Sequence, residues 1–259
     1  MMLLFTDTYL RGMAIYAHDK IVPDEKSNVT KKIQVAEMFD SIAGRYDFLN
    51  HFLSAGIDKG WRKKGIKELQ NINPKIILDV ATGTGDLAVT ANSILHPEKI
   101  VGIDISEGML ELGRKKIKAL KLDNTIELVK GDSETINYRD SSFDAITVAF
   151  GVRNFENLEK GINEMFRVLK PGGKVSIIEC TMPKNFLLKG FYNFYMFTVV
   201  PAFGKLFASN GKAYKYLNNS VQAFPDRKNF LNIMNKAGFK NTYYKSLTLG
   251  VCCIYCGSK

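Results

Sequence analysis

The sequence contains few residues that bind metals. Its 259 residues include three histidines and four cysteines, and no two histidines have the spacing of a paired metal ligand. Cys253 and Cys256 form one Cys-x-x-Cys motif, but no second motif is present to complete a zinc site. We therefore predict that the protein binds no metal and that its cysteines are reduced side chains of the core.

Long apolar runs are also missing. No stretch of about eighteen uninterrupted apolar residues occurs, so we expect no segment that spans a bilayer. The N-terminal run Met-Met-Leu-Leu-Phe lacks the basic leader and the small-residue cleavage site of a signal peptide. These absences predict a cytoplasmic protein, whose translation starts at Met1 or at Met13.

Positive charge is in excess, with a net charge of +10 and a pI near 9.3. The lysines are dispersed along the chain, and no RNA-binding signature accompanies them. We expect a solvated basic surface with a weak attraction to anionic lipid at the inner face of the cell membrane, and no nucleic-acid partner. The sequence leaves open whether the chain forms a homo-oligomer.

The most informative segment is Ile76–Ala88, an apolar strand followed by a glycine-rich turn and the start of a helix. The strand contains Asp79, and the turn contains Gly83 and Gly85. Glycines at such a turn allow the backbone to adopt positive φ angles and to approach a ligand closely. A nucleotide-like cofactor is therefore expected at this turn.

A second apolar run, Lys99–Asp104, ends in a carboxylate nineteen residues after Gly85, where an acid can bind the two hydroxyls of a ribose. The turn also fits a dinucleotide pattern. However, Asp86 stands at the helix N-terminus and would repel a pyrophosphate. S-adenosylmethionine has no phosphate and carries two positive charges, so we favour this methyl donor over a dinucleotide.

Apolar runs alternate with helical patterns along most of the chain, which is typical of a doubly wound parallel sheet. The predicted strands are 76–80, 100–104, 126–130, 144–149, 174–179, 239–246 and 249–255, and the predicted helices are 31–45, 61–69, 87–94, 107–120, 158–169 and 226–237. Pro171-Gly172-Gly173 is expected to end a helix and turn the chain. The prediction is an α/β fold with a mostly parallel, seven-stranded, Rossmann-like sheet that closes in an antiparallel hairpin.

This pattern divides the chain into an N-terminal arm, 1–30, which we expect to be partly disordered, and one domain, 31–259. Within that domain, 31–72 is expected to form a helical cap. An insertion at about 183–216 is rich in phenylalanine and tyrosine. We interpret it as an amphipathic lid over an apolar substrate channel or a membrane, with a buried helical excursion as the alternative.

Three segments resemble the menaquinone/ubiquinone biosynthesis C-methyltransferases, the family of demethylmenaquinone methyltransferase. The first signature is carried by Tyr46-Asp47-Phe48-Leu49-Asn50, Ser54-Ala55-Gly56 and Trp61-Arg62, the second by Arg167 to Glu179, and the loop between them by Ala149-Phe150-Gly151-Val152-Arg153-Asn154. The resemblance extends from about Lys31 to the end of the chain. It implies a class I S-adenosylmethionine-dependent methyltransferase.

Both the turn and the resemblance assign residues to the cofactor. The turn and its strand contribute Gly83, Gly85 and Asp79, while the resemblance implies Thr84, Asp104, and the pair Asp132 and Ser133 beside the adenine. The implied acceptor is a lipophilic polyprenyl quinol, with demethylmenaquinol preferred. A benzoquinol of ubiquinone biosynthesis, or another hydrophobic acceptor, remains the alternative.

The implied chemistry suggests catalytic residues. A quinone ring carbon is electron-poor, so the acceptor must be the reduced quinol, whose ionised oxygen makes the neighbouring carbon nucleophilic. A phenol-like hydroxyl has a pKa near ~10, so a base or a positive charge must favour its ionised form. Arg153 is predicted to supply that charge and Asn154 a hydrogen bond, while Asp47 and Tyr46 take or relay the proton.

Two other classes of function fit this sequence less well. A nucleic-acid amino-methyltransferase would need an Asp/Asn-Pro-Pro-aromatic segment after the fourth strand, where this chain has Phe-Gly-Val-Arg-Asn. A non-catalytic binding module would have little need for the glycine turn together with both acids. We therefore predict an enzyme.

Overall fold

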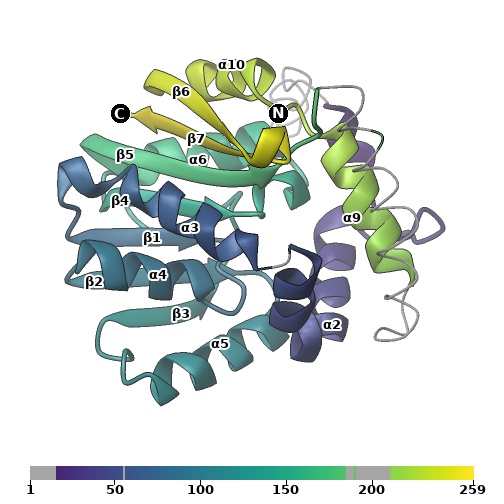
Figure 1. Ribbon diagram of the computed structural model, residues 1–259, viewed down its shortest axis with the longest axis horizontal. Helices are drawn as coiled ribbons and strands as arrows, with labels where there is room; N and C mark the ends of the chain where they lie inside the picture. Colours follow the sequence, from purple (N-terminus) through teal and green to yellow (C-terminus); the bar gives the residue numbers. More distant parts are fainter. Residues whose placement is uncertain (1–15, 55, 185–189, 191–210) are drawn as a thin grey trace, which may run out of the picture.

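A seven-stranded sheet forms the centre of the molecule in the computed structural model, which describes residues 16–54, 56–184, 190 and 211–259 (Figure 1). The strands are β1 (Ile76–Val80), β2 (Lys99–Asp104), β3 (Ile126–Lys130), β4 (Phe143–Ala149), β5 (Leu169–Cys180), β6 (Lys240–Leu247) and β7 (Cys252–Ser258). Their order in the sheet is β3-β2-β1-β4-β5-β7-β6. The first five strands are parallel, and β7 runs antiparallel to both β5 and β6. The predicted mostly parallel sheet with a closing hairpin is confirmed.

Helices cover both faces of this sheet. The α-helices are α2 (Lys31–Leu53), α3 (Ile57–Lys67), α4 (Asp86–Leu95), α5 (Glu107–Ala119), α6 (Leu158–Val168), α9 (Gly211–Ala223) and α10 (Lys228–Lys236), and the 3₁₀ turns include η1 (Ala17–Lys20), η3 (Val152–Asn154) and η5 (Thr248–Gly250). One apolar cluster joins the sheet to α3, α4 and α5, and a second joins its other face to α6 and α10. Helices α2 and α9 lie at the end of the sheet where the parallel strands finish (Figure 1).

Two helix boundaries near the N-terminus differ from the prediction. The first helix was expected to end at Arg45, but α2 continues to Leu53, because no proline or glycine interrupts it between Tyr46 and Leu53. It stops before Gly56, whose φ of +75° places it in the left-handed region. Helix α3 then begins at Ile57 rather than at Trp61.

The glycine-rich segment before the fifth strand forms a bulge. Helix α6 ends at Val168 and β5 begins at once, but the pairing with β4 jumps from Leu169 to Lys174. Gly172, with a φ of +79°, donates its backbone N–H to the carbonyl of Lys259 at 2.9 Å. The expected turn is therefore present, but it is enclosed within the strand.

The C-terminal third contains further differences. Helix α9 was not predicted, and it overlaps the end of the expected aromatic insertion. Residues 185–189 and 191–210 of that insertion lie outside the described residues, so its interpretation as a lid remains a prediction. The last strand begins at Cys252 rather than at Leu249, which belongs to η5. Among the described residues, no helix combines the length and the apolar character that crossing a bilayer requires.

The two glycines of α3 allow a test of its packing. An alanine Cβ at Gly65 would lie 2.5 Å from Cδ1 of Ile178 in β5, whereas one at Gly60 would meet no atom within 4 Å. We expect Gly65→Ala to lower the free energy of unfolding by about 1–3 kcal/mol through overpacking. Gly60→Ala should raise it by about 0.5–1 kcal/mol because alanine favours the helix. Urea unfolding measures both, and equal effects would show that Gly65 does not set the distance between α3 and β5.

Candidate functional site

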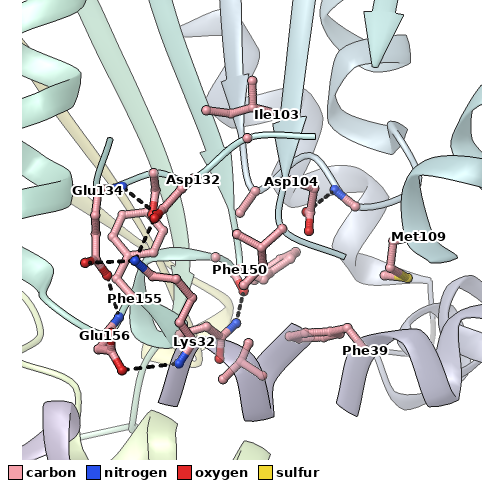
Figure 2. Close-up of a pocket in the computed structure, with 18 of the residues that line it drawn as sticks. Lys32, Phe39, Ile103, Asp104, Met109, Asp132, Glu134, Phe150, Phe155 and Glu156 are labelled. Atoms are coloured by element: carbon pink, nitrogen blue, oxygen red, sulfur yellow. Dashed lines mark hydrogen bonds and ion pairs between the residues drawn. The ribbon is translucent and has the colours of Figure 1, made fainter. Parts of the chain in front are cut away.

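A pocket opens where the parallel strands finish, between the strand-end loops and helix α2 (Figure 2). The turn after β1 contributes Gly83, β2 contributes Asp104, and the segment after β3 contributes Asp132, Ser133 and Glu134. The loop after β4 contributes Phe150 and Asn154, and α2 contributes Lys32, Val35 and Phe39 from the opposite side. Of the predicted site residues, Gly83, Asp104, Asp132, Ser133 and Asn154 meet in the wall of this pocket, and their roles remain predictions.

Asp104 is the acid that the pocket presents at the end of β2. Its Oδ2 accepts a hydrogen bond from the backbone N–H of Gly83 at 2.7 Å, and its Oδ1 accepts one from the backbone N–H of Ser106 at 2.9 Å. Burial raises the pKa of Asp104, although these backbone hydrogen bonds act in the opposite direction. The carboxylate is thus fixed between the first and second strand-end loops.

The glycine turn positions its residues differently. Gly83 has a φ of +57° and faces the pocket, while Gly85, with a φ of +82°, caps α4. The side chain of Thr84 is only 3% exposed, and its Oγ1 accepts a hydrogen bond from Nζ of Lys116 at 3.0 Å. Lys116 also pairs with Asp86 at 2.8 Å. The Thr84 side chain therefore anchors the turn to α5, and its contact with a cofactor remains a prediction.

Asp79 is buried beside this turn. Its two oxygens accept hydrogen bonds from the hydroxyls of Thr82 and Thr147, both at 2.6 Å. Burial raises the pKa of Asp79 to about 6, against the effect of these two hydroxyls. Asp79 is absent from the residues that line the pocket. Its visible role is to hold Thr82 at the start of the turn.

The loop after β4 is organised around Phe150, whose φ of +59° is unusual for a residue with a side chain. Its ring lies against Trp61, with 6.2 Å between ring centroids, and below the guanidinium of Arg62 at 5.3 Å. Its carbonyl accepts hydrogen bonds from Nη1 of Arg153 at 2.7 Å and from Nδ2 of Asn154 at 3.3 Å. The two predicted catalytic residues of this loop are therefore tied to one carbonyl.

Arg153 and Asn154 have different surroundings. Arg153 is 5% exposed and forms an ion pair with the fully buried Glu179, with 2.6 Å between Nη1 and Oε1. Arg153 is not among the lining residues, whereas Asn154 is. Oδ1 of Asn154 accepts a hydrogen bond from the hydroxyl of Tyr216 in α9 at 3.2 Å. Sequence reasoning missed Glu179 and Tyr216, because both act through contacts between distant segments.

The other two predicted catalytic residues, Tyr46 and Asp47, lie in the C-terminal half of α2. Their side chains lie outside the described part of the structure, so their roles remain predictions. Lys32 at the other end of α2 was not predicted, because it lies off the apolar stripe that identified the helix. In the part of the chain that the structure describes, no three histidine, cysteine or acidic side chains are grouped as a metal site.

The chain resembles known sequences over most of its length. Residues 26–259 match the model of the ubiE/COQ5 methyltransferase family. The chain is 46% identical to a demethylmenaquinone methyltransferase of Bacteroides fragilis, over 94% of this chain and 99% of that protein. It is 46% identical to a ubiquinone/menaquinone biosynthesis C-methyltransferase UbiE of Geotalea daltonii, over 87% of this chain and 96% of that protein.

Solved structures show the same fold at low sequence identity. A S-adenosylmethionine-dependent methyltransferase of Thermotoga maritima, described as a possible histamine N-methyltransferase, has a TM-score of 0.60 and 20% identity over 86% of this chain and 99% of that chain. The [4+2]-cyclase SpnF has a TM-score of 0.61 and 17% identity over 84% of this chain and 76% of that chain. These structural similarities show the class I methyltransferase fold and do not identify the methyl acceptor.

Proposed function

Because the chain belongs to the ubiE/COQ5 methyltransferase family, we propose that it methylates a ring carbon of a reduced polyprenyl quinol, with demethylmenaquinol as the preferred acceptor. The chain is a S-adenosylmethionine-dependent methyltransferase. The observation that carries the choice of acceptor is the near full-length similarity to demethylmenaquinone methyltransferases at 41–46% identity. The proposed place of action is the cytoplasm, at the inner face of the cell membrane.

The pocket suits this cofactor. When bound, S-adenosylmethionine supplies an electrophilic methyl group on a sulfonium. Asp104 presents a fixed carboxylate for the ribose hydroxyls, and the backbone of Gly83 leaves space beside it. Asp132 and Ser133 are proposed to hold the adenine, since they line the same pocket after β3. Apolar Ile103 and Met109 complete the walls, as a largely buried ligand requires.

The loop after β4 is proposed to activate the quinol. Asn154 lines the pocket, and its amide carries a second N–H besides the one donated to the Phe150 carbonyl. That N–H is proposed to bind the quinol oxygen that ionises. Glu179 and the Phe150 carbonyl orient the Arg153 guanidinium next to Asn154, where its charge favours the ionised oxygen. Tyr46 or Asp47 of α2 is proposed to accept the proton.

A basic face on α3 supports a weak peripheral attachment to the membrane. Of the six outward-facing residues of this helix, four are lysines, and the set is Ile57, Lys59, Gly60, Lys63, Lys64 and Lys67. Within the described residues, none of these lysines forms an ion pair. Trp61 of this helix donates a hydrogen bond to Thr248 of η5 at 2.8 Å, and each of the two elements has an exposed apolar side chain, Ile57 at 46% and Leu249 at 74%. Lysines beside projecting apolar side chains fit an anionic lipid surface.

The acceptor is tested directly with purified protein. We expect methyl transfer from S-adenosylmethionine to a chemically reduced demethylmenaquinone, detected by mass spectrometry, and none to the oxidised quinone. A strain that lacks the gene should accumulate demethylmenaquinone. Faster transfer to a benzoquinol precursor of ubiquinone would reassign the acceptor. Binding of S-adenosylhomocysteine without transfer to any reduced prenylquinol would identify a non-catalytic binding protein.

The role of Arg153 is tested in a variant that also lacks the charge of Glu179. Arg153→Ala alone would leave the Glu179 carboxylate buried without a counter-charge, which would lower the free energy of unfolding by about 3–5 kcal/mol. In the double variant Arg153→Gln/Glu179→Gln we expect unchanged binding of S-adenosylhomocysteine and a kcat lowered about a hundredfold or more. Arg153→Lys keeps the charge and should retain more turnover. A double variant with the kcat of the unmodified enzyme would remove Arg153 from the reaction.

Membrane attachment is tested by sedimentation with lipid vesicles. Replacing Lys59, Lys63 and Lys67 by glutamine should weaken binding to vesicles that contain phosphatidylserine by about a hundredfold, since each lysine contributes about 1 kcal/mol near an anionic surface. The control replaces the exposed Lys228 and Lys236 of α10, on the other face of the sheet, and Lys240 at the start of β6, and should bind like the unmodified protein. Equal losses in both variants would show an unspecific effect of net charge.

A further inference from the structure

Helix α2 carries a lysine in its first turn that reaches the acids on the other side of the pocket (Figure 2). Nζ of Lys32 lies 2.6 Å from Oδ2 of Asp132 and 3.3 Å from Oε2 of Glu134. All three side chains line the pocket. Lys32 is thus the cation through which a helix from one side of the pocket holds the acids on the other side.

Glu134 extends this connection to a third segment. It is 4% exposed, and its Oε1 accepts hydrogen bonds from the backbone N–H groups of Glu156 and Asn157, both at 2.9 Å. Its own backbone N–H donates to Oδ1 of Asp132 at 2.9 Å. The side chain of Glu156 returns to α2, where Oε1 accepts from the backbone N–H of Lys32 at 3.4 Å. Three separate segments of the pocket rim therefore meet at Lys32.

Lys32 supplies the positive charge that offsets the acidic side chains beside it. Two carboxylates, those of Asp132 and Glu134, lie at the Lys32 ammonium, and a third, that of Glu156, accepts a hydrogen bond from the Lys32 backbone. Burial works against the charged ammonium, but the hydrogen bond to Asp132 and the charges of both acids outweigh it and raise the pKa of Lys32. Without the ammonium, Asp132 and Glu134 would repel one another in a partly buried place, and α2 would lose its ion pairs to both acids.

We infer that Lys32 is a positioning residue that couples docking of α2 to binding of the methyl donor, by holding Asp132 in place at the adenine end of the pocket. The inference rests on the methyl-donor site of the proposed function but not on its acceptor. Binding of the donor then stabilises the docked helix, and the docked helix stabilises bound donor, because the two equilibria share one contact.

The inference is tested with S-adenosylhomocysteine, which needs no acceptor. We expect Lys32→Met to raise the Kd of this ligand about tenfold by calorimetry, in proportion to the loss of a charge-assisted hydrogen bond. Lys32→Arg should keep most of the affinity. The matched control, Lys118→Met, removes an exposed lysine of α5 and should leave the Kd unchanged.

Hydrogen exchange distinguishes coupling from a purely structural role. In the unmodified protein, saturating S-adenosylhomocysteine should slow exchange both in 31–43 of α2 and in the turn at 83–86. In Lys32→Met, the turn should keep this protection and α2 should lose it. If both proteins show the same ligand-dependent protection of α2, or if the Kd changes less than twofold, Lys32 has no coupling role.

A double-mutant cycle identifies the partner of Lys32. In an Asp132→Asn background, Lys32→Met should raise the Kd less than threefold, because the shared contact is already weakened. A full tenfold effect in that background would place the action of Lys32 elsewhere and overturn the inference. An unmodified protein that binds no S-adenosylhomocysteine would instead contradict the proposed function itself.

Discussion

The hydrogen bond from the Gly83 backbone to the Asp104 carboxylate joins the loops of the first two strands, and the rest of the pocket is built around it. Parallel strands end at one edge of the sheet, so their loops become neighbours whatever their separation in sequence. The bond converts this proximity into a fixed geometry. It also determines which way the acid points, because Ser106 occupies its other oxygen.

This arrangement buries negative charge, which is unfavourable in itself. Burial raises the pKa of both Asp79 and Asp104, and the charge of Asp104 raises that of Asp79 further, while the charge of Asp40 does the same to Asp104. The hydroxyls of Thr82 and Thr147 and the backbone groups at Asp104 offset part of this cost. A binding site for a positively charged donor explains why the cost is tolerated, since a cation in the pocket favours the ionised form of both acids.

The parallel strands that end at this edge, and Asp104 at the end of β2, could be predicted because local sequence patterns specify them. A short apolar run that ends in a glycine turn allows few alternatives, and β1 and β3 have the predicted bounds. Helix α9 was missed because its sequence is largely polar, and the extension of α2 because tyrosine, phenylalanine, asparagine and aspartate have only modest helix propensity. Lys32, Glu179 and Tyr216 were missed for a related reason. Each contributes through a partner at least 26 residues away, which no short pattern reveals.

The fold alone does not determine the reaction, since a cyclase has the same architecture at a TM-score of 0.61. The reaction must therefore be determined by the residues around the transferred methyl group. The loop after β4 lacks the Asp/Asn-Pro-Pro-aromatic segment with which nucleic-acid amino-methyltransferases hold an exocyclic amine. The positive φ of Phe150 turns its carbonyl toward Arg153 and Asn154. Trp61 and Arg62 of α3 hold the ring of the same residue. A single strained residue thereby links α3, through its ring, to Arg153 and Asn154, through its carbonyl.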